Sequence, residues 1–253
     1  PERLRSVAVA ADRAGLEQLW VWEDCFKESG IAASAAILGW TEQLAVGIGL
    51  MPVPLRNVAL TAMEIATLER LFPGRIVPGV GHGVLDWMGQ VGVRAASPMT
   101  LLREYTSALR SLLHGETVTT AGRYVQLTDV ALDWPPAAPP KVLVGGVRER
   151  TVALAGELGD GVIFTGDTTP DVLRDALPHF RAGQAAADRD DSADLVVFMT
   201  VEGRPAANDV ADRVGRFVEL GATHVILHSL GDGGPALEEF VEFVAHEVRP
   251  LVG

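Results

Sequence analysis

Residues 158–166 read LGDGVIFTG, a helix-ending glycine followed by a short apolar run, and this junction decides the fold. The same arrangement recurs as AGLEQLWVW at residues 14–22 and as LGATHVILH at residues 220–228. The glycines at the three helix ends, Gly15, Gly159 and Gly221, suit the left-handed conformation that closes a helix. The apolar runs after them are typical of buried strands. The repeated junction therefore predicts βα units.

Extending this pattern along the chain gives seven strands that alternate with eight helices. The strands are expected near 18–22, 44–51, 76–80, 141–145, 161–165, 195–201 and 224–228. The helices are expected near 2–14, 31–41, 58–71, 98–114, 147–158, 170–188, 208–220 and 235–247. Such alternation requires a parallel sheet covered by helices. We expect an α/β fold, a (β/α)8 TIM barrel whose first strand precedes Pro1. A doubly wound open sheet is the competing architecture.

The segment at about 116–140 interrupts the alternation, between the fourth and fifth strands of the expected barrel. It contains the alternating stretch YVQL at 124–127 and the proline-rich run WPPAAPPK at 134–141. These features predict an inserted hairpin followed by an extended connector. Residues 1–253 are therefore expected to form a single domain.

The composition excludes several classes of partner. The formal net charge of −12 argues against nucleic acid, because binding to phosphates depends on Lys and Arg. Cys25 is the single cysteine of the sequence, so no intramolecular disulfide can form, and no Cys/His cluster suggests a metal site. No run approaches the roughly 18 apolar residues of a membrane span, and no signal-peptide pattern is found. We expect a cytoplasmic protein without a membrane partner.

In a parallel barrel the working face lies where the strands end, so the residues after each strand are the first candidates. Glu23, Asp24 and Cys25 follow the first strand of the sequence. Carboxylates there can act as bases or orient a substrate, and a stabilised thiolate can act as a nucleophile. A solvated loop with a half-buried thiol explains the same residues without any chemistry.

Glycines are frequent at two further strands. Gly47 and Gly49 lie within the strand LAVGIGLM at 44–51, where glycine marks either a close ligand or tight barrel packing. Gly79, Gly81 and Gly83 flank His82, which is either a ligand contact or an ordinary loop histidine.

Two more strand ends could hold an anionic group. Gly145 and Gly146 lead into a helix that carries Arg148 in its first turn. Free N–H groups and the positive end of a helix suit a phosphate, although an ordinary tight βα turn looks the same. Thr165 and Gly166 could contact the same group, while Thr169 and Pro170 simply begin the next helix.

Four segments in order carry a family resemblance: TEQLAVGIG at 41–49, PLRNVALTA at 54–62, LERLFPGR at 68–75 and AGELGDGVI at 155–163. Together they resemble the luciferase-like monooxygenase superfamily over nearly all of residues 1–165. The chain is most similar to its deazaflavin branch, which uses coenzyme F420 and includes the methylenetetrahydromethanopterin reductases. The resemblance implies an α/β barrel with an insertion, a homodimer, and a small-molecule substrate that reacts beside the cofactor ring.

The resemblance also assigns expected roles to residues. It places Gly49 and Leu50 at a bulge with a non-prolyl cis peptide that backs the ring, and the loop after Gly145 beside the cofactor phosphate. The residues expected to bind the cofactor are Gly49, Leu50, Met51, Gly81, His82, Gly145, Gly146, Val147, Arg148, Thr165 and Gly166. Those expected to contact substrate or take part in the chemistry are Asp24, Cys25 and His82.

Two departures from the family limit the chemistry that can be carried over. Cys25 stands where the sugar-phosphate dehydrogenases of the family have a histidine base, and Val84 stands where they have an acidic residue. In the flavin luciferases a catalytic histidine aligns with Asp24. The sequence therefore predicts direct hydride transfer between F420 and a small organic substrate, with the enzyme supplying orientation and exclusion of water.

Two alternatives remain open at this point. One keeps the fold and uses FMN with oxygen in a monooxygenase. The other is a non-catalytic protein that binds the cofactor, because the expected acid and base are absent.

Overall fold

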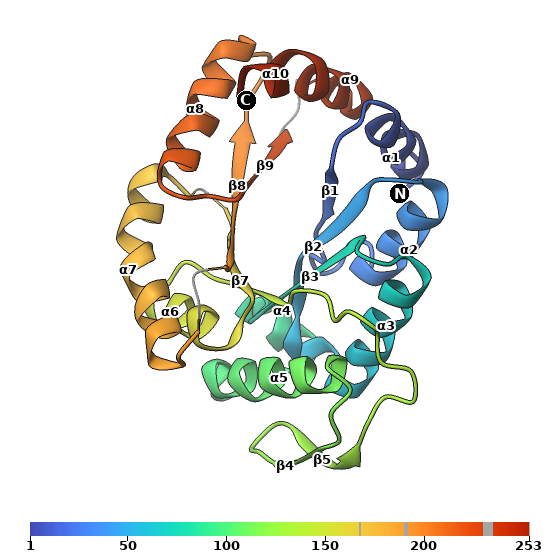
Figure 1. The fold of residues 1–253 in the computed structure, drawn as a ribbon, viewed down its shortest axis with the longest axis vertical. Coiled ribbons are helices and arrows are strands. Elements are labelled where there is room, and N and C mark those ends of the chain that lie inside the picture. The colour runs from blue at the N-terminus through green and yellow to red at the C-terminus, as the bar shows by residue number, and fades with distance from the viewer. Residues whose placement is uncertain (167, 190–191, 230–234, 253) are drawn as a thin grey trace.

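The computed structural model describes residues 1–166, 168–189, 192–229 and 235–252. Seven parallel strands form one sheet: β1 (Gln18–Val21), β2 (Ala45–Pro52), β3 (Ile76–Gly81), β6 (Leu143–Gly145), β7 (Gly161–Phe164), β8 (Asp194–Val201) and β9 (His224–Ser229). Each strand pairs with the next in that order, so the carboxyl ends of all seven lie at one edge. The sheet curls into a nearly closed barrel (Figure 1).

Helices surround the strands on the outside (Figure 1). They are α1 (Leu4–Arg13), α2 (Gly30–Trp40), the 3-10 turn η1 (Val53–Leu55), α3 (Val58–Leu71), α4 (Leu85–Gln90), α5 (Pro98–Leu113), α6 (Glu149–Leu158), α7 (Pro170–Ala186), α8 (Ala207–Glu219), α9 (Leu237–Phe243), the π-helical turn η2 (Val244–Val248) and α10 (Arg249–Val252). The prediction of an α/β barrel is confirmed. The short helix α4 was not expected from the sequence.

The two edges of the sheet are β1 and β9, and a cavity of about 870 Å³ lies between them. The expectation of a further strand before Pro1 concerns residues outside the sequence and stays an expectation. Among the helices that the structure describes, none combines the length and apolar character needed to cross a bilayer.

The insertion forms an antiparallel hairpin of β4 (Val118–Ala121) and β5 (Gln126–Val130), as predicted. It lies outside α5 (Figure 1). The carboxylate of Glu104 on α5 accepts backbone N–H groups of Arg123, Tyr124 and Val125 at 2.9, 2.8 and 3.0 Å. Glu104 therefore helps to fasten the hairpin to the barrel, together with the buried Val125 and Leu127.

The glycines at the helix ends differ in conformation. Gly15 and Gly221 have φ of +71° and +96°, as predicted for left-handed helix ends. The prediction for Gly159 was wrong, because its φ is −84°. A Cβ at Gly159 would lie 2.9 Å from the carbonyl oxygens of Ala155 and Gly161. Close approach of the backbone, not handedness, explains the glycine there.

Two apolar cores flank the sheet. The larger lies between the strands and the helices and includes Ile48, Met51 and Val80. The smaller fills the inside of the barrel, where Leu143, Ile163, Val196 and Phe198 pack with Trp20, Leu50, Val77 and Ile226. Because side chains alternate along a strand, this inner cluster identifies which residues of each strand point into the barrel.

Candidate active site

The inward-pointing residues nearest the carboxyl ends of the strands form a layer at the mouth of the barrel. Following the alternation from the inner core, they are Trp22, Leu50, Gly81, Gly145, Thr165, Thr200 and His228. The layer is uneven. The ends of β3, β6 and β7 contribute glycine and threonine, whereas the ends of β9 and β1 contribute aromatic rings. One side of the mouth, which we call the open side, is therefore lined mainly by small residues, and the other by aromatic rings that adjoin the cavity between β1 and β9.

Leu50 forms the floor of the open side. The register between β2 and β3 shifts between Ile48 and Met51, which is the bulge expected around Gly49 and Leu50. The partly exposed Leu50 side chain lies against Gly81 and Gly145. A Cβ at Gly81 would lie 2.7 Å from a Leu50 methyl group, and one at Gly145 would overlap both methyl groups. These glycines make room for Leu50.

The glycines of β2 have a packing role as well. A Cβ at Gly49 would lie 2.7 Å from the Phe198 ring, and one at Gly47 would overlap the Trp20 ring. Of the two explanations open for these glycines, the contacts favour barrel packing.

Two expectations for β2 are corrected. The cis peptide expected at Gly49–Leu50 is not there, and the described chain has one at Cys25–Phe26 instead. The Met51 side chain, which is 1% exposed, packs in the outer core and points away from the mouth. Only its backbone remains available to a ligand at the rim.

His82 lies at the open side of the mouth. Its Nε2 is 3.1 Å from Thr151 Oγ1 on α6, and its buried Nδ1 has no partner of good hydrogen-bond geometry among the described residues. Burial lowers the pKa of the imidazole, the Pro98 carbonyl acts in the opposite direction, and the Arg148 guanidinium lowers the pKa further. His82 is therefore neutral near pH 7.

The amino end of α6 follows β6 directly. Gly146 donates its N–H to the Ile163 carbonyl at 3.0 Å, and Arg148 is the N-cap residue without a side-chain cap. The backbone N–H groups of Glu149 and Arg150 have no acceptor within the described part of the chain. Unpaired N–H groups at the positive end of a helix suit an anion. Exposed Val147 precedes them.

Thr165 and Gly166 follow β7 on the same side of the mouth. Gly166 has φ of +71°, which favours glycine, and a Cβ built on it would meet nothing within 4 Å. Among the described residues, none outside its chain neighbours therefore approaches this turn closely. Asp167 lies outside the described residues.

Asp24 and Cys25 lie in the loop after β1. The Asp24 carboxylate is 44% exposed and 3.8 Å from Lys27 Nζ. Burial raises the pKa of the Cys25 thiol, and the carboxylates of Glu23 and Asp24 raise it further. The thiol is protonated at neutral pH, which removes the nucleophilic role that a thiolate would allow.

Glu23 belongs to a buried charge cluster that sequence reasoning missed. Arg56 Nη1 donates to both Glu23 carboxylate oxygens at 2.8 and 3.0 Å, and Arg56 Nε lies 3.7 Å from Glu64 Oε2. Glu23 Oε2 also accepts the Gly30 N–H at 2.9 Å. Burial raises the pKa of Glu64, and Arg56 lowers it. The cluster joins the loop after β1 to the starts of α2 and α3.

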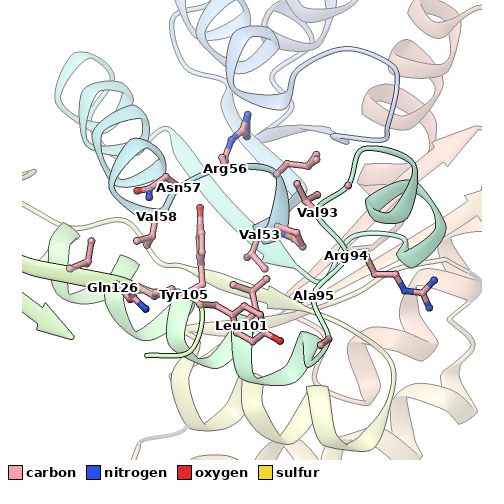
Figure 2. A pocket seen from close by; sticks show the side chains of 17 residues that line it. Val53, Arg56, Asn57, Val58, Val93, Arg94, Ala95, Leu101, Tyr105 and Gln126 are labelled. Carbon is pink, nitrogen blue, oxygen red and sulfur yellow. The ribbon is translucent and has the colours of Figure 1, made fainter. Parts of the chain in front are cut away.

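A cavity of about 680 Å³ lies outside the barrel next to this cluster (Figure 2). It is enclosed by the start of α3, the segment 92–96, α5 and the hairpin, and Val53, Leu101 and Tyr105 form much of its apolar wall. Burial raises the pKa of Tyr105 to about 12, and its hydroxyl donates to Thr61 Oγ1 at 2.6 Å. The lining offers no exposed group suited to acid or base chemistry at neutral pH.

Residues 1–240 match the family model of the luciferase-like monooxygenases. The chain belongs to this family. The resemblance noted in the sequence is therefore confirmed, and the parallel barrel with its mouth at the strand ends is the family's architecture in this chain.

Two relatives in the luciferase-like family are named as F420-dependent or pterin-linked enzymes. The chain is 25% identical to the 5,10-methylenetetrahydromethanopterin reductase of Methanolobus tindarius over 234 residues, which are 90% of this chain and 71% of the relative. It is 31% identical to an F420-dependent glucose-6-phosphate dehydrogenase of Kineococcus radiotolerans over 205 residues, 75% of this chain and 60% of the relative. The chain thus spans less than two thirds of the second relative's length.

Solved structures of the same fold cover almost the whole chain. An F420-dependent secondary alcohol dehydrogenase, solved with an F420–acetone adduct, gives a TM-score of 0.89 at 18% identity and covers 98% of this chain and 94% of its own. The coenzyme F420-dependent tetrahydromethanopterin reductase of Methanopyrus kandleri gives 0.87 at 18% identity, with 100% and 96% covered. A monooxygenase of Streptomyces bottropensis gives 0.85 at 16% identity, with 100% and 93% covered. At these identities the likeness concerns the fold.

Proposed function

We propose that this protein is an oxidoreductase that transfers a hydride between coenzyme F420 and a small organic substrate. The observation that carries the proposal is the uneven mouth of the barrel. Its open side, at Leu50, Gly81 and Gly145, adjoins the unpaired N–H groups of α6. A flat ring with an anionic tail fits that combination. The names of relatives in the luciferase-like family support F420 as the ring.

The residues present fit the cofactor. Leu50 would support the ring, and Gly81 and Gly145, whose space Leu50 occupies, let it lie close to β3 and β6. The tail would reach the first turn of α6, where Arg148 makes no ion pair with any residue that the structure describes. When bound, the deazaflavin supplies a ring carbon that accepts or donates a hydride.

The other expected site residues act on the substrate and its surroundings. Asp24, exposed at the mouth, would orient a substrate hydroxyl or hold its proton. Neutral His82 would lie beside the ring, with its buried Nδ1 turned toward the Pro98 carbonyl. Protonated Cys25 would serve as a polar wall and not as a nucleophile. The enzyme would thus contribute mainly orientation and exclusion of water.

An FMN-dependent monooxygenase is the second candidate. The family model describes monooxygenases, and one of the structures with the same fold is a monooxygenase. This candidate keeps the same mouth and the same anion site and differs in the ring and in the use of oxygen.

Fluorescence titration of the purified protein with F420, FMN and a tail-free deazaflavin tests both candidates. We expect F420 to bind most tightly, the tail-free deazaflavin more weakly, and FMN weakest. Tight FMN binding without a response to F420 would favour the monooxygenase. F420 binding without oxidation of the reduced cofactor by any carbonyl, imine or quinone acceptor would favour a non-catalytic binding protein.

We also propose a homodimer that works in a reducing cytoplasm. Leu60 and Met63, one turn apart on α3, are exposed apolar side chains. Exposed apolar faces of this kind mark protein interfaces. Sedimentation velocity measures the state directly, and Met63→Lys is expected to shift a dimer toward monomer.

A further inference from the structure

The side of the mouth at β1, β8 and β9 carries an aromatic wall, next to the cavity between β1 and β9. Trp22, after β1, is 37% exposed, and its ring centroid lies 5.5 Å from Phe198 and 5.2 Å from His228. Phe198 is buried and contacts Trp20 beneath it at 5.7 Å. Phe198 and Trp20 thus hold the Trp22 ring from below. Trp22 is partly exposed, whereas Phe198 is buried. Trp22, Phe198 and His228 all line the cavity between β1 and β9.

Further apolar side chains surround the mouth at other strand ends. Phe26 is 64% exposed, and Val84, Leu85 and Val147 are also exposed. They follow β1, β3 and β6, so they belong to three separate segments that meet at the rim. Exposed apolar groups after several strand ends favour an apolar ligand near the mouth.

The charges beside the wall do not suit an anionic substrate. Asp24, Lys27 and Glu28 line the rim end of the cavity, and the single cation among them lies 3.8 Å from the Asp24 carboxylate. Arg56, the nearest buried cation after β2, is already bound to Glu23. A phosphorylated substrate would find no unengaged arginine or lysine among these lining residues.

We infer that the substrate is an uncharged, planar, conjugated carbonyl compound whose ring stacks on Trp22. The inference rests on the proposed function, because it places the substrate between the aromatic wall and the cofactor side of the mouth. In reduction, the carbonyl carbon gains a hydride from the reduced deazaflavin and its oxygen gains a proton from water. An alcohol and the oxidised cofactor result. A sugar phosphate, the substrate named for some relatives, has no planar ring to stack on this wall.

Three ketones of similar size test the inference by ligand-observed NMR titration, with the protein alone and with saturating oxidised F420. Acetophenone carries the planar ring, cyclohexyl methyl ketone lacks it, and 4-acetylbenzoate adds a negative charge. Offset ring contacts strengthen binding by about threefold to tenfold beyond the area they bury. We expect acetophenone to bind more tightly than cyclohexyl methyl ketone by about that factor, and 4-acetylbenzoate to bind weakest.

Variants separate the wall from the rest of the protein. Trp22→Leu is expected to abolish the preference for acetophenone over cyclohexyl methyl ketone. Trp134→Leu, which removes a 75% exposed tryptophan in the insertion, should leave that preference unchanged. The three ketones are also compared on the wild-type protein. That comparison tests the preference for a planar ring even if Trp22→Leu folds poorly.

The outcomes distinguish this inference from the proposed function. Equal or tighter binding of 4-acetylbenzoate, or a preference that survives in Trp22→Leu, overturns the aromatic substrate. F420 binding with no preference among the ketones overturns the inference and leaves the proposed function standing. A ring preference in a protein that binds no F420 supports the wall and contradicts the proposed cofactor.

Discussion

Arg56 Nη1 donates hydrogen bonds to both carboxylate oxygens of Glu23, at 2.8 and 3.0 Å, with the two side chains only 15% and 10% exposed. Removing one partner leaves the other charge buried without compensation. We expect Arg56→Met and Glu23→Gln each to lower the free energy of unfolding by roughly 3 kcal/mol. Urea unfolding followed by circular dichroism measures the change.

The exposed pair of Arg103 and Glu157 provides the control. Exposed ion pairs contribute about 0–1 kcal/mol, so Arg103→Met should cost little. Equal losses for Arg56→Met and Arg103→Met would show that the Glu23 pair is no more than a surface contact. Because Glu23 also holds the Gly30 N–H, the larger loss should be accompanied by weaker F420 binding.

The Cys25 thiol is expected to react slowly with alkylating reagents. Burial raises its pKa, and the neighbouring carboxylates of Glu23 and Asp24 raise it further. Because the thiolate is the reactive species, the rate of iodoacetamide labelling should rise with an inflection above the ordinary cysteine range. Asp24→Asn removes one of the negative charges and should shift that inflection to lower pH, whereas Asp133→Asn in the insertion should not. Cys25→Ser should retain F420 binding.

Glu104 makes the attachment of the hairpin sensitive to acid. Partial burial raises the pKa of its carboxyl, but the backbone N–H groups of Tyr124, Val125 and Arg123 outweigh this and lower it below 4.5. A carboxyl whose pKa is lowered by folding contributes stability above its unfolded pKa, and that contribution is lost as the pH falls toward the folded value. Stability of the wild-type protein should therefore decline below about pH 4.5.

Glu104→Gln should lower the free energy of unfolding by roughly 1–3 kcal/mol at pH 7, since it weakens hydrogen bonds to three N–H groups, two of them partly buried. As the pH falls from 5 toward the folded pKa, the variant should lose less stability than the wild type. The difference between them is the contribution of the Glu104 carboxyl, which the variant lacks. Urea unfolding at several pH values measures both effects. An unchanged pH dependence would assign the acid sensitivity to other carboxylates.

Arg148 is expected to bind the anionic tail of the cofactor. A charge-assisted contact of this kind changes affinity by about tenfold. Arg148→Ala should weaken F420 binding by about that factor and leave the tail-free deazaflavin unaffected. The control variant is Arg181→Ala, which removes the same charge from the exposed surface of α7. It should bind F420 as tightly as the wild type does. An equal effect on both ligands would place Arg148 beside the ring or outside the site.

The fold could be predicted because its signals are local. A helix-ending glycine and an apolar run lie within nine residues of each other, and the junction at 158–166 became α6, β7 and the turn after it. The family motifs added the barrel and its working face. The conformation of Gly159 could not be predicted, because it depends on carbonyl oxygens brought near it by the fold.

The site was predicted less completely, and β2 shows why. Strict alternation from Gly47 and Gly49, which both face the inside of the barrel, would also point Met51 inward. The bulge between Ile48 and Met51 turns Leu50 inward and Met51 outward. The Glu23 pair was missed for a related reason, since its partner is 33 residues away and meets it only through the register of β1 and β2.

The contact between Gly145 and Leu50 allows a test of the floor by a double-mutant cycle. A Cβ at Gly145 would overlap the Leu50 methyl groups, so Gly145→Ala should destabilise the protein by roughly 1–3 kcal/mol. Leu50→Ala removes those methyl groups. The double variant should then be more stable than the sum of the single losses, with a coupling of roughly 0.5–3 kcal/mol, measured by urea unfolding.

Gly215→Ala is the control for this cycle, because a Cβ at that position of α8 meets nothing within 4 Å. It should stabilise the helix by roughly 0.5–1 kcal/mol and show no coupling to Leu50→Ala. The cycle also bears on the cofactor, since Leu50→Ala lowers the floor on which the ring is proposed to lie. F420 affinity should fall in Leu50→Ala and in the double variant alike. Additive stabilities, together with unchanged F420 affinity, would mean that Leu50 supports neither Gly145 nor the ring.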